Sequence, residues 1–135
     1  MSRVMVDSNI LLDIFTEDKK WFNWSSGQLA KYADAGELCI NQIIYAEISI
    51  GFDRIEDLEA VLSKDYFTCL NIPYEAAFLA GKCFLQYRRA GGKKRAPLPD
   101  FFIGAHAAVE GMPLLSRDKN RYQSYFPGLN VIAPE

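Results

Sequence analysis

The 135-residue sequence has little of the side chains on which many catalytic sites and cross-linked folds depend. It holds one histidine, His106, and three cysteines, Cys39, Cys69 and Cys83, with no CxxC spacing. An odd cysteine count does not make a disulfide framework, and one histidine leaves little material for a zinc site or a Ser-His-Asp triad. We expect the three thiols to be buried as small apolar side chains, and His106 to be packed or at a dimer interface.

Long apolar runs are also missing. No run approaches the ~20 residues that cross a bilayer, and the apolar stretch before Asp7 is far too short for a signal peptide. Neither of the glycine-rich phosphate-binding patterns, GxxxxGK[ST] and GxGxxG, occurs. Together with the odd number of thiols, these absences predict a cytoplasmic protein with no membrane association.

The composition suits one folded domain. Half of the residues are hydrophobic, 13% are aromatic and 24% are charged, which excludes a disordered tail or a coiled-coil rod. A chain of this length can bury roughly two-thirds of its unfolded surface without a disulfide or zinc. We therefore expect residues 1–135 to form a single domain.

The net charge of −2 hides an uneven distribution. Residues 88–95 hold five of the 15 basic residues and no acid, so the rest of the chain has ten basic residues against 17 acidic ones. Such a basic segment could bind a phosphate backbone at one place, or it could be a solvated loop at a helix end. The candidate RNA-binding residues are Arg88, Arg89, Lys93, Lys94 and Arg95.

Short apolar segments alternate with helical patterns along the whole chain. This alternation predicts an α/β fold with a short parallel sheet of four to five strands between helices. The strands are expected near residues 4–6, 38–40, 66–72, 114–115 and 129–132. Helices are expected over residues 10–15, 25–35 and 42–51, and another is expected to begin at a capping box at 53–56. Further helices are expected from Pro73 to Gly91, over 99–111 and over 118–125.

Three acids lie where such a sheet places its functional groups. Asp7 directly follows the first predicted strand, Asp118 follows the fourth, and Asp100 is at the start of a predicted helix. In open parallel sheets, the site lies beyond the carboxyl ends of the strands. Each position also has an ordinary structural explanation, because Asp7 and Asp100 would serve as helix caps and Asp118 as a turn or cap residue.

Glu47 is the most informative acid. The predicted helix places Ile43, Ala46, Glu47 and Ile50 on one face, and a carboxylate on an apolar face is costly unless a cation or a basic side chain pairs with it. The alternative is that the helix phase differs and Glu47 is exposed. Four carboxylates with few cations between them suit a hard divalent ion, Mg²⁺ or Mn²⁺. Ser8, Asn9 and Ser116 could orient the ligands or a water molecule.

Four segments in order then resemble the PIN-domain ribonucleases, and among them the VapC-type toxins of bacterial toxin–antitoxin pairs. The resemblance extends from near residue 4 to near residue 133. The matching segments are VDSNILLD at 6–13, YAEISIG at 45–51, LPDFFIGAHA at 98–107 and LSRDKNRY at 115–122. The family often has threonine where Ser8 and Ser116 stand, and serine keeps the hydroxyl.

The resemblance implies a metal-dependent endoribonuclease with a PIN-like fold. It implies that Asp7, Glu47, Asp100 and Asp118 form the catalytic metal-binding set, and that Ser8 or Asn9 and Ser116 support it. It also implies a homodimer and a VapB-like antitoxin that blocks the acidic groove, often with a basic side chain. Two alternatives stay open, a non-catalytic module that binds a basic partner peptide and a housekeeping RNA-processing nuclease.

Overall fold

A computed structural model describes residues 2–91 and 98–135. Strands and helices alternate along them, as the sequence predicted. No helix in these two ranges is long and apolar enough to cross a bilayer. The elements are β1 (Ser2–Val6), α1 (Ser8–Phe15), α2 (Phe22–Ala35), β2 (Gly36–Ile40), α3 (Gln42–Ser49), α4 (Ile55–Val61), β3 (Phe67–Cys69), α5 (Tyr74–Arg89), α6 (Leu98–Glu110), β4 (Leu114–Leu115), α7 (Lys119–Tyr125) and β5 (Val131–Ile132).

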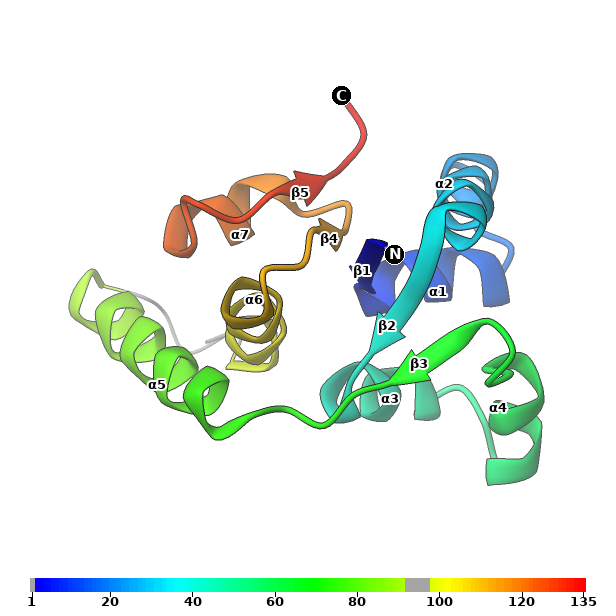
Figure 1. The fold of residues 1–135 in the computed structure, drawn as a ribbon, viewed down its shortest axis with the longest axis horizontal. Helices are drawn as coiled ribbons and strands as arrows, with labels where there is room; N and C mark the ends of the chain where they lie inside the picture. The colour runs from blue at the N-terminus through cyan, green and yellow to red at the C-terminus, as the bar shows by residue number, and fades with distance from the viewer. Residues whose placement is uncertain (1, 92–97) are drawn as a thin grey trace.

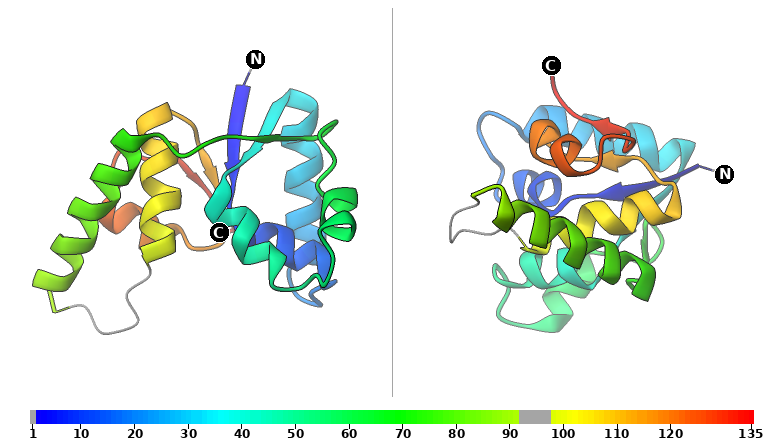
Figure 2. Two further views of the ribbon diagram at one scale, coloured as in Figure 1. Left: turned by 90° about the horizontal axis from the view of Figure 1, so that it is seen from below. Right: turned by 90° about the vertical axis from the view of Figure 1, so that its left-hand side faces the viewer.

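The five strands form one sheet in the order β3-β2-β1-β4-β5, and every neighbouring pair is parallel. Helices α5 and α6 lie on one side of the sheet, and α1 and α2 lie on the other (Figure 1, Figure 2). The predicted α/β class and the parallel sheet of four to five strands between helices are therefore confirmed.

The central strand β1 shows why the sequence folds this way. Val4, Met5 and Val6 are all buried, although alternate side chains of a strand point to opposite faces. Helices cover both faces of the sheet, so consecutive apolar residues are needed rather than an alternating pattern. The same strand pairs with β2 on one side and with β4 on the other, which places the end of β1 between the ends of both neighbours.

Several element boundaries differ from the predicted ones. β3 is limited to Phe67–Cys69, because only these residues pair with β2 at the edge of the sheet. α2 begins at Phe22, three residues earlier than predicted. The predicted capping box is wrong, since Arg54 is the N-cap of α4 and makes no side-chain cap bond. Pro73 is the N-cap of α5 rather than its first helical residue.

The expectations for the thiols and the histidine are confirmed in part. Cys39 and Cys83 are buried, but Cys69 is exposed because it ends the edge strand β3. His106 is buried in α6, and its Nδ1 lies 3.0 Å from the Nδ2 atom of Asn41. Burial lowers the pKa of His106, and the ring accepts this hydrogen bond because an amide nitrogen can only donate. His106 therefore packs in the core and ties α6 to the residue that caps α3.

Gly104 lets α7 approach α6 closely. A Cβ atom at this position would lie 2.5 Å from Cε2 of Phe126 and 3.1 Å from Cδ1 of Tyr122. We expect Gly104→Ala to lower the free energy of unfolding by about 1–3 kcal/mol, because both aromatic rings must shift. Gly81→Ala is the matched control, since nothing lies within 4 Å of a Cβ there and alanine favours a helix. Urea unfolding measures both variants, and a Gly104→Ala variant as stable as wild type would contradict the expectation.

Candidate metal centre

The carboxyl ends of three adjacent strands meet at the centre of the sheet edge. Asp7 follows β1, Asn41 follows β2 and Ser116 follows β4. β2, the next strand along the chain, lies on one side of β1, and β4 lies on its other side. In parallel sheets, a crevice forms where the strand order reverses in this way. Asp7 is therefore at the middle of the candidate site, and Asn41 is used for a different purpose, as the N-cap of α3.

Asp7 is the most deeply buried acid of the predicted set and collects four donors. It is the N-cap of α1, and its Oδ1 atom accepts the Ser8 backbone N–H at 2.8 Å. Its Oδ2 atom accepts the Ser116 hydroxyl at 2.7 Å and the Tyr122 hydroxyl at 3.0 Å, with Asn9 Nδ2 at 3.4 Å. Asp7 is thus a helix cap, as its ordinary explanation required, but capping accounts for only one of these contacts.

All four donors to Asp7 are neutral, although the residue is only 3% exposed. Burial raises the pKa of Asp7 to about 7, and the negative charge of Asp100 adds to the rise. The hydrogen bonds from Ser116, Tyr122 and Ser8 act in the opposite direction and lower the pKa. The carboxylate therefore sits where a cation would lower its energy.

Glu47 comes to the same site from α3, although the helix phase inferred from the sequence was wrong. The buried residues of α3 are Ile44 and Ile48, whereas Ala46 is exposed and Ile50 is 87% exposed. Glu47 lies at the border of the buried face and is half-buried. The Ser8 hydroxyl donates to its Oε1 atom at 2.7 Å.

The charge of Glu47 is also poorly compensated. Burial raises the pKa of the Glu47 carboxyl, and the hydrogen bond from Ser8 opposes this rise. The nearby Asp100 carboxylate raises the pKa further. Because Asp100 acts on both Glu47 and Asp7, the three carboxylates share one electrostatic environment.

Asp100 joins the site from the first turn of α6. Tyr122 connects it to Asp7, because the Tyr122 hydroxyl lies 3.0 Å from Asp7 Oδ2 and 3.4 Å from Asp100 Oδ1. Burial raises the pKa of Tyr122 well above its usual value, and the neighbouring charges of Asp7 and Asp100 add to it. The hydroxyl therefore stays protonated and serves as a donor. No local sequence pattern shows that the Tyr122 hydroxyl reaches two acids, so its role is visible only in the structure.

Asp118 lies at the exposed side of the group. It is the N-cap residue of α7, as its ordinary explanation required, but its side chain makes no cap bond. The Asn9 amide links it to the centre, with Nδ2 3.4 Å from Ser116 Oγ and 3.5 Å from Asp118 Oδ2. Arg121 donates to Asp100 Oδ2, and its NH1 atom lies 3.9 Å from Asp118 Oδ2. Arg121 was not among the predicted site residues, although its spacing from Asp118 is that of neighbours on a helix.

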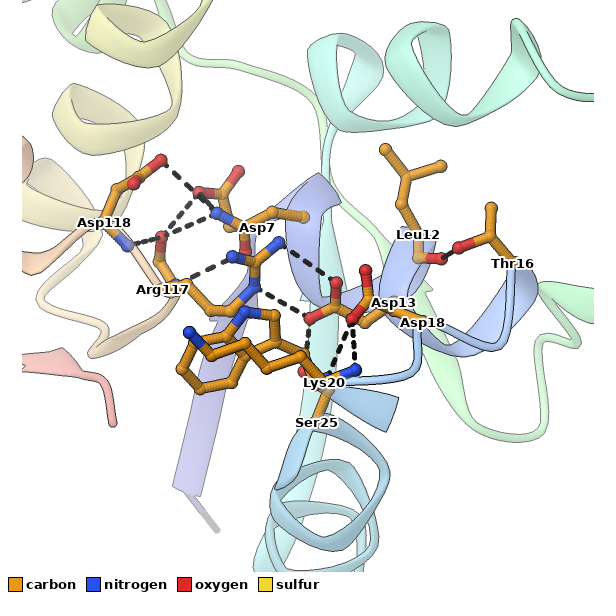
Figure 3. Close-up of polar contacts among 12 residues, drawn as sticks. Asp7, Leu12, Asp13, Thr16, Asp18, Lys20, Ser25, Arg117 and Asp118 are labelled. Carbon is orange, nitrogen blue, oxygen red and sulfur yellow. Dashed lines mark hydrogen bonds and ion pairs between the residues drawn. The ribbon is translucent and has the colours of Figure 1, made fainter. Parts of the chain in front are cut away.

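A second network holds the loop that carries Ser116 and Asp118. Arg117 forms two hydrogen bonds with Asp13 of α1, from Nε at 2.9 Å and from NH2 at 3.1 Å. The Ser25 hydroxyl donates to the same carboxylate at 2.7 Å. Figure 3 shows Arg117 between the Asp7 side of the site and this buried Asp13.

The donor set fits a hydrated Mg²⁺ or Mn²⁺ ion. All of the grouped ligand atoms are oxygens, and the central carboxylate is buried with only neutral donors around it. Over residues 2–91 and 98–135, no three acidic, histidine or cysteine side chains are grouped closely enough to enclose an ion. Mg²⁺ keeps several water molecules and commonly takes only one or two protein carboxylates, so a closed cage is not required.

The predicted basic segment is described only at its start. Arg88 and Arg89 are exposed in the last turn of α5, and the Arg88 guanidinium lies over the Phe84 ring, 5.8 Å from its centroid. Lys93, Lys94 and Arg95 lie outside the described residues. The segment leads along the chain from α5 to α6, which carries Asp100.

Comparison with known proteins agrees with this architecture. The sequence matches the PIN domain family over residues 4–126, and the chain therefore belongs to that family, whose members are nucleases. No curated protein matches the sequence.

Several solved structures have a similar fold, and one of them is described as a toxin–antitoxin complex, from Klebsiella pneumoniae. VapBC2 from Rickettsia felis bound to a promoter DNA fragment has a TM-score of 0.76 at 17% identity, over 98% of this chain and 99% of that one. VapBC-1 from nontypeable Haemophilus influenzae has a TM-score of 0.73 at 17% identity, over 97% of both chains. FitAcB from Neisseria gonorrhoeae has a TM-score of 0.66 at 16% identity, also over 97% of both. At such identities, these likenesses establish the fold.

Proposed function

We propose that this protein is a metal-dependent endoribonuclease and the toxin of a toxin–antitoxin pair. The observation that carries the proposal is the buried Asp7 carboxylate, which has only neutral donors at the central strand end. Glu47 and Asp100 act on the same environment from two helices, and the chain belongs to a nuclease family. The proposed cofactor is Mg²⁺ or Mn²⁺.

The proposed roles follow from the positions of the side chains. Asp7, Glu47 and Asp100 would hold a hydrated ion, each directly or through one of its water molecules, and Asp118 would assist at the exposed side. When bound, a divalent ion offsets charge on the scissile phosphate and lowers the pKa of a water nucleophile. Ser116 and Tyr122 fix the orientation of Asp7, and Ser8 fixes that of Glu47. In-line attack by water needs no covalent enzyme intermediate, which agrees with the described hydrogen-bond partners of Asp7, since none of them is a histidine or a cysteine.

The proposed partners are RNA, an antitoxin and a second copy of the chain. Arg88 and Arg89, which are exposed in the last turn of α5, support binding of an RNA backbone. The Arg121 guanidinium already contacts Asp100 and Asp118, so a basic side chain of a VapB-like antitoxin would find a suitable acidic surface. The exposed Tyr74, Phe78 and Leu85 of α5 support a homodimer.

Cleavage of a mixed, structured RNA pool tests the proposed function. We expect wild-type protein to cut with Mn²⁺ or Mg²⁺ and to stop in EDTA. Glu47→Gln removes one ligand charge but keeps an acceptor for Ser8, and we expect at least a tenfold loss of rate, of the order found when metal-site groups are altered. Glu56→Gln is the matched control, because Glu56 pairs only with Arg54 on the exposed surface, and it should cut like wild type.

Three results would decide against the proposal. Cleavage that persists in EDTA would contradict metal dependence, and equal rates for Glu47→Gln and wild type would remove Glu47 from the site. A protein that neither cuts the pool nor binds Mn²⁺ would favour a non-catalytic module that binds a basic partner peptide. Mapping the cut ends of a positive reaction would identify the RNA class.

A further inference from the structure

Arg121 is the cationic side chain that the structure places on the candidate metal ligands. It projects from α7 and donates to Asp100 Oδ2, with the same NH1 atom 3.9 Å from Asp118 Oδ2. The Tyr122 hydroxyl lies 3.4 Å from the other oxygen, Asp100 Oδ1. Both oxygens of Asp100 therefore face a donor of the protein itself.

We propose that Arg121 is an internal competitor for the divalent cation. Its guanidinium neutralises Asp100 and Asp118 while no ion is bound, and it moves away when an ion takes the same carboxylate oxygens. This inference rests on the proposed function, since it assumes that Asp100 and Asp118 are ligands. It adds a regulatory role for a residue outside the set of acids.

Two observations favour competition over a fixed supporting role. A guanidinium and a divalent cation on one carboxylate oxygen repel each other, so each lowers the affinity of Asp100 Oδ2 for the other. The Arg121 side chain is half-exposed, and its contacts with Asp100 and Asp118 lie at the solvent side of the site. It can therefore swing into water at little cost, unlike Arg117, whose partner Asp13 is buried.

The consequence is a link between the ion and RNA. A guanidinium released from Asp100 is an unpaired donor beside the acids, where it can bind a phosphate oxygen of the substrate. Phosphate binding by Arg121 would then favour the state in which the carboxylates are free for the ion. By linkage, RNA and the ion should each raise the affinity of the protein for the other.

Mn²⁺ titration of the purified protein without bound RNA tests the competition directly. The EPR signal of the free ion reports how much Mn²⁺ is bound. We expect Arg121→Gln to bind Mn²⁺ about two- to fivefold more tightly than wild type, the range for removing one partly exposed ion pair. Lys119→Gln is the matched control, because it removes the same charge from the exposed first residue of α7. The thermal midpoints of both variants show whether the fold is retained.

Each result of the titration decides the proposal. Tighter binding by Arg121→Gln than by Lys119→Gln supports competition. Equal Mn²⁺ affinities of the two variants would mean that Arg121 affects the ion only through its positive charge, as Lys119 does. Weaker Mn²⁺ binding by Arg121→Gln would mean that Arg121 positions Asp100. Either of these results overturns the proposal.

Asp7→Asn separates this inference from the proposed function. If wild type binds Mn²⁺ more tightly than Asp7→Asn but Arg121→Gln equals wild type, only the role of Arg121 fails. If wild type, Asp7→Asn and Arg121→Gln all fail to bind Mn²⁺, both the metal site and the competition are overturned. A second readout is the affinity for a single-stranded DNA oligonucleotide, used as an analogue without the 2′-hydroxyl. Mn²⁺ should raise this affinity for wild type more than for Arg121→Gln, and an equal rise in both would remove the proposed link to substrate.

Discussion

Asp7→Asn is expected to abolish RNA cleavage, with a loss of at least about 100-fold, while the protein stays folded. The reason is that Asp7 lies at the centre of the strand ends and provides the buried negative charge of the site. Loss of a group that holds a metal ligand in place already costs 10–100-fold in many metalloenzymes, so loss of the central ligand should cost more. Asp53→Asn is the matched control, since Asp53 is exposed before α4. Comparable cleavage by Asp7→Asn and Asp53→Asn would remove Asp7 from the mechanism.

The same substitution should stabilise the metal-free protein above neutral pH. The pKa of Asp7 is about 7 in the folded protein against a usual value of 3.8, so the folded state retains a proton that the unfolded state releases. The stability from this proton is fully present below about pH 4 and is lost as the pH rises through about 7. Asparagine does not titrate, so its advantage over wild type grows from pH 4 to 7 and then levels off.

Urea unfolding in EDTA at pH 5 and pH 8 measures this effect. We expect Asp7→Asn to exceed wild type by about 2–4 kcal/mol at pH 8, after allowing for hydrogen bonds that the amide cannot accept. With excess Mn²⁺ at pH 8, wild type should gain stability and Asp7→Asn should gain much less. If Asp7→Asn were less stable than wild type in EDTA at pH 8, the buried charge of Asp7 would not destabilise the folded state.

Arg117→Ala is expected to cause a large loss of stability, although the Arg117 side chain is partly exposed. It removes both hydrogen bonds from Arg117 to Asp13, whose carboxylate is 3% exposed in the intact protein, and leaves Asp13 with one side-chain donor, Ser25. Breaking a buried ion pair by removing one partner costs about 3–5 kcal/mol. Because Arg117 is also partly exposed, we expect a loss near 3 kcal/mol. The contact of its guanidinium with Trp21, 5.1 Å from the ring centroid, is lost as well.

Two further variants test the cause of this loss. Arg54→Ala removes an exposed ion pair with Glu56 and should cost less than about 1 kcal/mol. Adding Asp13→Asn to Arg117→Ala should recover part of the lost stability, because the unpaired buried charge is then gone. Urea unfolding at pH 7 measures all three proteins. A double variant less stable than Arg117→Ala alone would mean that Asp13 stabilises the fold through its other contacts.

The sequence predicted much of the site because a short stretch of sequence is enough to show where a buried strand ends. Apolar runs such as 4–6 and 114–115 mark buried strands, and the polar residues after them must lie at one edge of a parallel sheet. Asp7 and Ser116 were found in this way, and the structure joins them by a hydrogen bond of 2.7 Å. The phase of α3 was inferred wrongly, because Ile43, Ile44, Ile48 and Ile50 are spread around this short helix and do not define one face.

The sequence by itself determined the fold class, the approximate positions of the strands and the acids that follow them. These are set by hydrophobic runs and turn residues within short windows of the chain. Only the tertiary structure decided that β1 lies between β2 and β4, and hence that Tyr122 reaches both Asp7 and Asp100 and that Arg121 reaches Asp100. These contacts join residues far apart in the chain, because the order of strands in a sheet depends on how all of its helices pack.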